Sequence, residues 1–277
     1  EGEEAEFQEY TLVKFQSEDV VVPMATLRPE TVHGVTNAFV NPEGTYVRAT
    51  VDGETWIVSE DAVEKLRLQE RAVDVAETFA GERLVGTTVA NPVTGDDVLV
   101  LPADFVDPDN ATGVVMSVPA HSPDDWVALE AVKADADRLR AFDIDPEEVA
   151  AIEPRAIIDV EGYGEFPARD AVEAFGIESQ DDPALEEATQ EVYNREFHAG
   201  TLKDMYGEYA GSVVEDVRDE LKADFESRGD FDAMYEFSED VVCRCGGDVE
   251  VAKQETWFLR YNDEDWKAET RRIVDQM

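Results

Sequence analysis

Cysteine and histidine are scarce in the 277-residue chain, which has only two cysteines and three histidines. The histidines show no metal-ligand spacing; they are His33, His121 and His198. Cys243 and Cys245 alone cannot complete a four-ligand zinc site, and residues two apart form a strained disulfide. One interpretation is a reduced chain with two incidental thiols. The other is half of a zinc site whose remaining ligands lie outside this sequence.

Several other signatures are missing. No apolar run is long enough to span a membrane, and the start, Glu1-Gly2-Glu3-Glu4, is the opposite of a basic signal peptide. Neither a Walker loop nor a Gly-x-Ser-x-Gly elbow occurs, and Gly162-Tyr163-Gly164 lacks the third glycine of a dinucleotide site. We therefore expect a cytoplasmic protein without membrane contact, and neither nucleotide-loop nor serine-triad chemistry.

Positive charge is also scarce. Seven lysines and sixteen arginines face 66 acidic residues, which leaves a net charge of −43 spread along the whole chain. One interpretation is a nucleic-acid mimic, and the other is a protein built for multi-molar salt, where the Debye length falls to about 3 Å. The even spread and the shortage of lysine favour a halophilic protein. At such salt the charge does not forbid contact with RNA.

Apolar residues make up 43% of the chain, which is enough for a packed core. Asp52-Gly53 is a strong hairpin signal, and Ser59 and Ser122 are suitable N-caps for helices. The pattern predicts an α+β fold with a closed or nearly closed, β-barrel-like core of short strands and peripheral helices. The expected strands are residues 10–15, 19–27, 45–51, 54–59, 84–90, 97–101 and 113–118.

Helical patterns dominate after about residue 140. We expect a short helix after Asp145-Pro146, a strand over 154–160, and helices over 166–175 and 183–196. An apolar stripe at helical spacing then ends near Gly229. A small hairpin around 243–247 and a final helix over 263–277 complete the pattern. Because the chain starts with Glu1 and stops inside a predicted helix, we expect it to be a segment of a longer protein.

The segment Thr26-Leu27-Arg28-Pro29-Glu30-Thr31 follows a predicted strand and carries two hydroxyls, a guanidinium and a carboxylate. Such a bend leaves backbone N–H groups free, and its hydroxyls can orient a water or a ribose. The alternative is an ordinary helix entrance in which Glu30 and Thr31 serve the first turn. Residue types alone favour that alternative.

A second segment runs from Thr112 to Asp125, where a buried strand enters a proline-bounded loop with His121 and then a helix. A carboxylate at Asp125 is stabilised by the helix N-terminus, so we expect it to stay ionised and to be able to hold an ammonium group. The alternative is that Asp125 only caps the helix and that His121 is a plain loop residue. The residue types leave both interpretations open.

Together the two segments resemble the editing domain of the synthetases for leucine, isoleucine and valine. Residues 101–113, 162–168 and 178–183 are similar to the archaeal and eukaryotic leucyl enzymes, and the similarity covers about residues 10–265. The His-x-Gly-His and Lys-Met-Ser-Lys-Ser signatures of aminoacylation are missing. The resemblance therefore implies an editing domain without its catalytic domain, which alone would use ATP.

The resemblance also implies roles for individual residues. Asp125 matches the aspartate that grips the substrate's amino group, and Thr26 lies near the scissile ester, so these two are the candidate catalytic residues. Thr31 lies beside the amino-acid side chain, and Arg28 matches the motif's arginine. Leu27 departs from the bacterial pattern, which has a second threonine there. The remaining pocket-lining candidates are Met116, Val118 and His121.

The implied reaction is hydrolysis of the ester of mischarged tRNA(Leu), carrying norvaline or isoleucine, by a positioned water without metal or other cofactor. The implied partners are the aminoacylated 3′ end of tRNA(Leu) and the parent catalytic domain. Zinc could bind Cys243 and Cys245 only with ligands from outside the segment. The alternatives are a non-catalytic RNA- or protein-binding module on the same fold and an acidic nucleic-acid mimic.

The resemblance divides the chain into four parts. Residues 1–22 would connect to the missing catalytic domain, and residues 23–140 would form the editing core with both motifs. Residues 141–235 would hold an insertion of archaeal and eukaryotic type with the rest of the core. Residues 236–277 would return toward the catalytic domain with half a zinc-type knuckle.

Overall fold

A computed structural model describes residues 5–257 and 263–274 of the chain. Two antiparallel hairpins begin the fold: β1 (Phe7–Ser17) with β2 (Val20–Thr26), and β4 (Thr45–Val51) with β5 (Glu54–Ser59). The turn between β4 and β5 has positive φ at both Asp52 and Gly53, as the sequence predicts for a tight hairpin.

One ten-stranded sheet results, with the order β6-β4-β5-β2-β1-β7-β8-β3-β9, and β12 pairs with β1. The added strands are β3 (Asn37–Val40), β6 (Val73–Ala80), β7 (Thr88–Ala90), β8 (Asp97–Pro102), β9 (Val114–Ser117) and β12 (Phe231–Phe237). The α+β class is confirmed. Within the described residues the strand pairing is an open path from β6 to β9, and β9 packs against β2 without a ladder, so the core is barrel-like but not a closed barrel. The outer strand β6 is largely exposed and carries acidic side chains, which protect an open edge.

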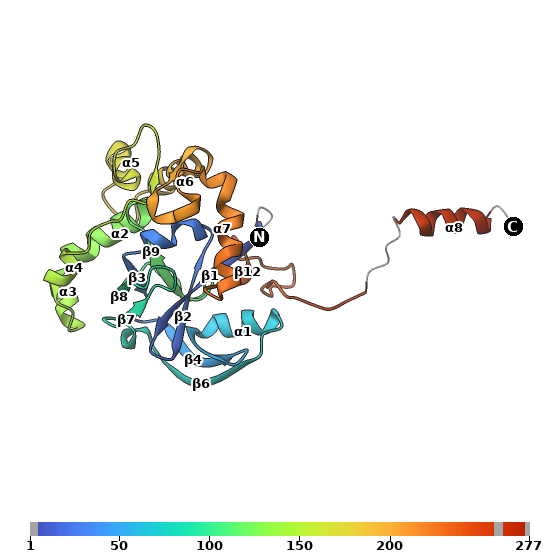
Figure 1. Ribbon diagram of the computed structural model, residues 1–277. Coiled ribbons are helices and arrows are strands. Elements are labelled where there is room, and N and C mark those ends of the chain that lie inside the picture. The colour runs from blue at the N-terminus through green and yellow to red at the C-terminus, as the bar shows by residue number, and fades with distance from the viewer. Residues whose placement is uncertain (1–4, 258–262, 275–277) are drawn as a thin grey trace.

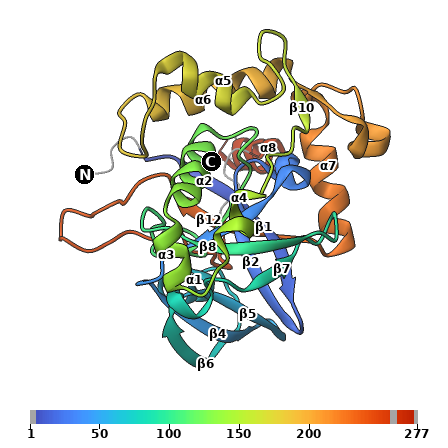
Figure 2. The same ribbon diagram turned by 90° about the vertical axis from the view of Figure 1, so that its left-hand side faces the viewer.

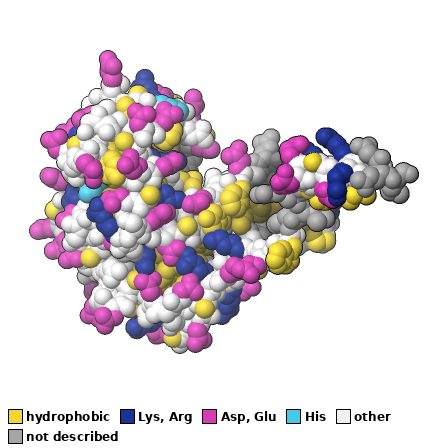
Figure 3. Space-filling model, turned by 45° about the vertical axis from the view of Figure 1, so that its right-hand side comes forward, with side chains coloured by type: hydrophobic (Ala, Val, Ile, Leu, Met, Phe, Trp, Pro, Cys, Tyr) yellow, Lys and Arg dark blue, Asp and Glu magenta, His cyan; other side chains and the backbone are white. Residues whose placement is uncertain are grey.

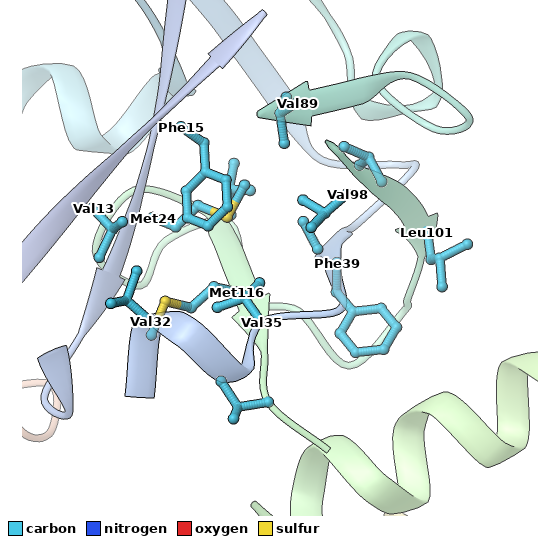
Figure 4. Close-up of a cluster of buried hydrophobic side chains, with 14 of the residues drawn as sticks. Val13, Phe15, Met24, Val32, Val35, Phe39, Val89, Val98, Leu101 and Met116 are labelled. Carbon is cyan, nitrogen blue, oxygen red and sulfur yellow. The ribbon is translucent and has the colours of Figure 1, made fainter. Parts of the chain in front are cut away.

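The main core lies where β9, at one end of the sheet, packs against β2. Side chains from β1, β2, β3, β8 and β9 point toward one another there (Figure 4). Val32 of the short 3-10 helix η1 (Pro29–Gly34) and Val35, which follows it, close this cluster next to Met116 of β9. Buried apolar packing of this kind is what fixes the position of η1, which carries half of the first motif.

Helices form a layer over one side of the sheet (Figures 1 and 2). The helices α2 (Pro123–Ala134), α5 (Pro167–Phe175) and α6 (Leu185–Ala199) pack around a cluster of their own that includes Val127, Val172 and Val192. The helix α7 (Val214–Arg228) buries Leu221 and Phe225 and ends at Gly229 in the left-handed conformation. As predicted, Ser122 caps α2 and Ser59 caps α1 (Glu60–Leu68).

Short elements connect these layers. The helices are α3 (Ala136–Ala141) and α4 (Pro146–Ala150), and the 3-10 turns are η2 (Gly81–Arg83) and η3 (Asp204–Tyr209). The two-residue strands β10 (Ile158–Asp159) and β11 (Thr201–Leu202) pair with each other. The strands expected over 84–90 and 154–160 are therefore mostly irregular, because only their last residues find a partner strand.

The C-terminal part extends away from the body and ends in α8 (Glu264–Val274), which buries no side chain (Figure 1).

Cys243 and Cys245 are joined by a disulfide, which contradicts the interpretation as two free thiols. The expectation of a half zinc site stays a prediction. Residues 275–277 of the predicted final helix lie outside the described residues. Among those described, no helix is long and apolar enough to cross a membrane.

On the face shown in Figure 3, acidic side chains are scattered rather than gathered in one patch. With a net charge of −43, self-repulsion should loosen the fold when it is not screened. We expect the melting temperature to rise steeply between 0.1 M and 3 M potassium chloride. Thermal denaturation followed by circular dichroism measures this, and a melting temperature independent of salt would exclude a halophilic protein.

Candidate functional site

All eight site residues proposed from the sequence line one cavity of about 420 Å³. The cavity lies between the end of β2, strand β9, the start of α2 and helix α6. Its proposed members are Thr26, Leu27, Arg28, Thr31, Met116, Val118, His121 and Asp125. Residues that the sequence analysis did not select also line it: Tyr10, Ala25, Phe105, Val115, Ser122, Asp124, Gln180, Thr189 and Tyr193.

The first motif is a bend held by its own hydroxyls. The Thr26 hydroxyl accepts a hydrogen bond from the backbone N–H of Arg28 at 2.9 Å. The Thr31 hydroxyl donates to the Arg28 carbonyl at 2.8 Å, and Thr31 is only 3% exposed. Thr31 thus serves the first turn of η1, as the ordinary helix-entrance interpretation expects, and lines the cavity as well. Leu27 is 44% exposed at the rim.

The Arg28 guanidinium contacts two carboxylates, a backbone carbonyl and an aromatic ring. Its Nε donates to Glu30 at 3.0 Å, its Nη1 to the His121 carbonyl at 3.1 Å, and its guanidinium lies 4.3 Å from the centre of the Tyr193 ring. Nη2 forms an ion pair with Glu196 at 2.5 Å. Burial disfavours the charge, but Glu196 and Glu30 outweigh it, so the pKa of Arg28 is raised and the guanidinium stays charged.

His121 is fully buried, and both ring nitrogens are engaged. Nε2 accepts from the backbone N–H of Ile157 at 2.8 Å, and Nδ1 lies 2.6 Å from Glu196. Because a backbone N–H can only donate, Nδ1 carries the ring proton and donates it to Glu196. The ring therefore supports the cavity wall rather than offering a free nitrogen to a ligand.

Asp125 begins α2 beside the cavity. Its Oδ2 accepts from the backbone N–H of Val118 at 2.8 Å, and its own N–H donates to the capping Ser122 hydroxyl at 3.3 Å. Burial raises the pKa of Asp125 to about 7, although the Val118 hydrogen bond opposes this. The carboxyl thus titrates near neutral pH, which corrects the expectation that the helix N-terminus keeps it ionised.

Helix α6 supplies three polar residues of the site that the sequence analysis missed. Thr189 donates to the Asp124 carboxylate, the Tyr193 hydroxyl donates to Ser122 at 3.1 Å, and Glu196 holds Arg28. These three positions share one helix face, which their spacing could have indicated. The sequence around α6 does not indicate that this face packs against the two motifs, because that contact depends on the tertiary fold. Among the described residues, no group of three or more histidines, cysteines or carboxylates is arranged to hold a metal ion.

Comparison with known proteins identifies relatives of the chain. A family model described as the leucyl-tRNA synthetase editing domain matches residues 9–139. Leucine–tRNA ligase of Methanopyrus kandleri is 49% identical over 282 residues, covering 100% of this chain and 30% of that protein. The Pyrococcus furiosus ligase is 47% identical over 288 residues, with 100% and 30% covered.

Solved structures agree on the fold. The editing domain of the P. falciparum cytosolic leucyl-tRNA synthetase superposes with a TM-score of 0.74 at 18% identity, covering 82% of this chain and 99% of that one. The P. knowlesi domain gives 0.75 at 18% identity, covering 83% and 97%. The chain spans about 30% of the length of the archaeal relatives that it matches. These findings identify the chain as an editing domain of the leucyl-tRNA synthetase family, with archaeal enzymes among its relatives.

Proposed function

We propose that the chain hydrolyses the ester bond of tRNA(Leu) carrying a wrong amino acid such as norvaline or isoleucine. The observation that carries this proposal is the cavity itself, in which the Asp125 carboxyl faces the same space as two threonines and an apolar wall. An aminoacyl ester offers complementary groups: an ammonium for the carboxylate and a side chain for the apolar wall of Met116 and Val118. A cavity of about 420 Å³ accommodates a group of that size.

In the proposed mechanism, ionised Asp125 holds the ammonium and so fixes the ester near Thr26. A positioned water then attacks the carbonyl carbon of the ester. The bond from that carbon to the ribose oxygen breaks, and the oxygen leaves as a hydroxyl with a proton from the water. Proximity supplies most of the acceleration, so no strong base and no metal are required. Thr31 would limit the space for the side chain, because a hydrophobic pocket alone separates side chains differing by one methylene by only about 1–3 kcal/mol.

Binding of the ammonium should itself favour the ionised carboxyl. The pKa of Asp125 is raised to about 7 by burial, and an adjacent positive charge lowers it again. We therefore expect the hydrolysis rate of isoleucyl-tRNA(Leu) at limiting substrate to rise with pH between about pH 5.5 and pH 7. Above that range the substrate's own α-amino group loses its proton, so the test is confined to the acid side. An assay of isoleucine release between about pH 5.5 and pH 7 measures this, and a rate that falls over this range would contradict the assigned role.

The proposal extends to the surroundings of the site. The partners would be the aminoacylated 3′ end of tRNA(Leu) and the catalytic domain of the parent synthetase, in the cytoplasm and at high salt. Zinc, if it binds the reduced Cys243 and Cys245, would need ligands from that parent. The fragment itself would not aminoacylate, and ATP would serve only the catalytic domain.

The second candidate is a non-catalytic RNA- or protein-binding module. Turnover separates the two: one part of the chain is mixed with twenty parts of isoleucyl-tRNA(Leu) in 3 M potassium chloride. We expect many equivalents of isoleucine to be released per chain, well above the loss without protein. Binding of tRNA with release at the spontaneous rate would favour the module instead.

A further inference from the structure

Helix α6 places Thr189 and Tyr193 in the cavity wall and Glu196 behind it, against Arg28 and His121. Thr189, Tyr193 and Glu196 follow one another at spacings of four and three residues, so they lie on one helix face. All three lie beyond residues 9–139, the part that matches the editing-domain model. Through them, a segment distant in the sequence contacts both motifs of the site.

Of these three residues, Glu196 contacts both motifs through its carboxylate. Its side chain is 0% exposed, and its two oxygens bind two different motifs: Oε2 pairs with Arg28 at 2.5 Å and Oε1 accepts from His121 at 2.6 Å. Burial alone would raise the pKa of Glu196, but Arg28 and His121 lower it below its ordinary value. A buried carboxylate with both oxygens paired is costly to disturb.

Arg28 and His121, the two partners of Glu196, belong to the two motifs of the site. Arg28 belongs to the bend between Thr26 and Thr31, and its guanidinium also bonds the His121 carbonyl, which is four residues before Asp125. His121 ties the second motif to the backbone at Ile157. Moving the Glu196 carboxylate would therefore shift both motifs relative to each other.

We propose that Glu196 is a positioning residue of the editing site. It fixes the distance between the two motifs by holding Arg28 and His121 at once, and it does not touch the substrate. This inference rests on the proposed function, since the motifs it aligns are those assigned to the ester and the ammonium. The competing explanation is that the ion pair only stabilises the packing of α6.

The test compares Glu196→Gln with Glu187→Gln, which removes the same charge from an exposed position on the same helix. A glutamine can accept from Arg28 or from His121, but its amide group then faces the other donor. We expect kcat for isoleucyl-tRNA(Leu) to fall about 10²-fold with KM within about threefold, because a misplaced site loses rate rather than binding. Glu187→Gln should match the wild type. Glu196→Asp, which keeps the charge, should recover part of the rate and serves if the glutamine variant does not fold.

A second readout does not depend on activity. Nitrogen NMR of His121 and of the Arg28 Nε–H group should show an Nδ1-protonated ring and a solvent-protected guanidinium in the wild type, and a change at one or both in Glu196→Gln only. If a folded Glu196→Gln keeps the wild-type kcat, the proposal is overturned. If the wild type releases no amino acid, the proposed function fails, and the NMR comparison still decides whether Glu196 holds the two motifs: unchanged signals would overturn the inference as well.

Discussion

Replacement of Asp125 by asparagine is expected to lower the hydrolysis of isoleucyl-tRNA(Leu) by about 10²-fold or more while leaving the fold intact. In the proposed mechanism the carboxylate forms a charge-assisted bond to the ammonium, worth about 1.5–3 kcal/mol, and its loss would also misplace the ester. Asparagine has nearly the same shape and can still accept from the Val118 N–H. The measurement is release of isoleucine in 3 M potassium chloride.

The same substitution should raise stability at neutral pH. Because the folded-state pKa of Asp125 is raised to about 7, the folded chain holds a proton there that the unfolded chain loses near pH 4. The protonated carboxyl therefore contributes stability below pH 4, and this is lost as the pH rises through 7. The melting temperature of Asp125→Asn should equal that of the wild type at low pH and exceed it above pH 7. A lower melting temperature at pH 8, with activity retained, would mean that Asp125 only caps α2.

Replacement of Thr31 by alanine should allow the chain to hydrolyse correctly charged leucyl-tRNA(Leu). If the Thr31 side chain blocks the branched end of leucine, truncation removes an overpacking cost of about 1–3 kcal/mol, which is a gain of tens-fold in rate. The substitution also removes the bond to the Arg28 carbonyl, so we expect a loss of about 1 kcal/mol in stability.

Thr31→Val is the matched control, because it loses the same hydroxyl but keeps the bulk. It should lose similar stability and still spare leucyl-tRNA(Leu), whereas Thr31→Tyr should block every side chain. The measurement is leucine release by the four proteins. If Thr31→Ala and Thr31→Val behave alike toward leucyl-tRNA(Leu), the side-chain limit lies at another residue.

The parts of the fold that local physics decides were predictable from the sequence. The hairpin at Asp52-Gly53 and the caps at Ser59 and Ser122 depend only on neighbouring residues, and the structure has all three. Strand β6 was not predictable, because its side chains are mostly exposed and its conformation depends on pairing with β4. The sequence left open whether the barrel-like core closes, since closure depends on how strand ends meet; the strand pairing stays open.

In the site, too, features set by neighbouring residues were predictable and those set by tertiary contacts were not. The two motifs were found because each is a continuous stretch with a recognisable composition, and the structure brings all eight proposed residues to one cavity. Glu196 was missed because it lies 168 residues from Arg28 in the sequence. The raised pKa of Asp125 was missed for a related reason: it comes from burial, which no local pattern reports. The domain boundaries at residues 22, 140 and 235 stay predictions.

Competition between two esters in one tube tests the central claim most directly. Isoleucyl-tRNA(Leu) and leucyl-tRNA(Leu), carrying different radiolabels, are mixed with a catalytic amount of the wild-type chain in 3 M potassium chloride. We predict rapid release of isoleucine while leucine is lost at the spontaneous rate, and no accelerated release of either by Asp125→Asn. Equal release of both amino acids, or isoleucine release that survives in Asp125→Asn, would contradict selective hydrolysis in this cavity.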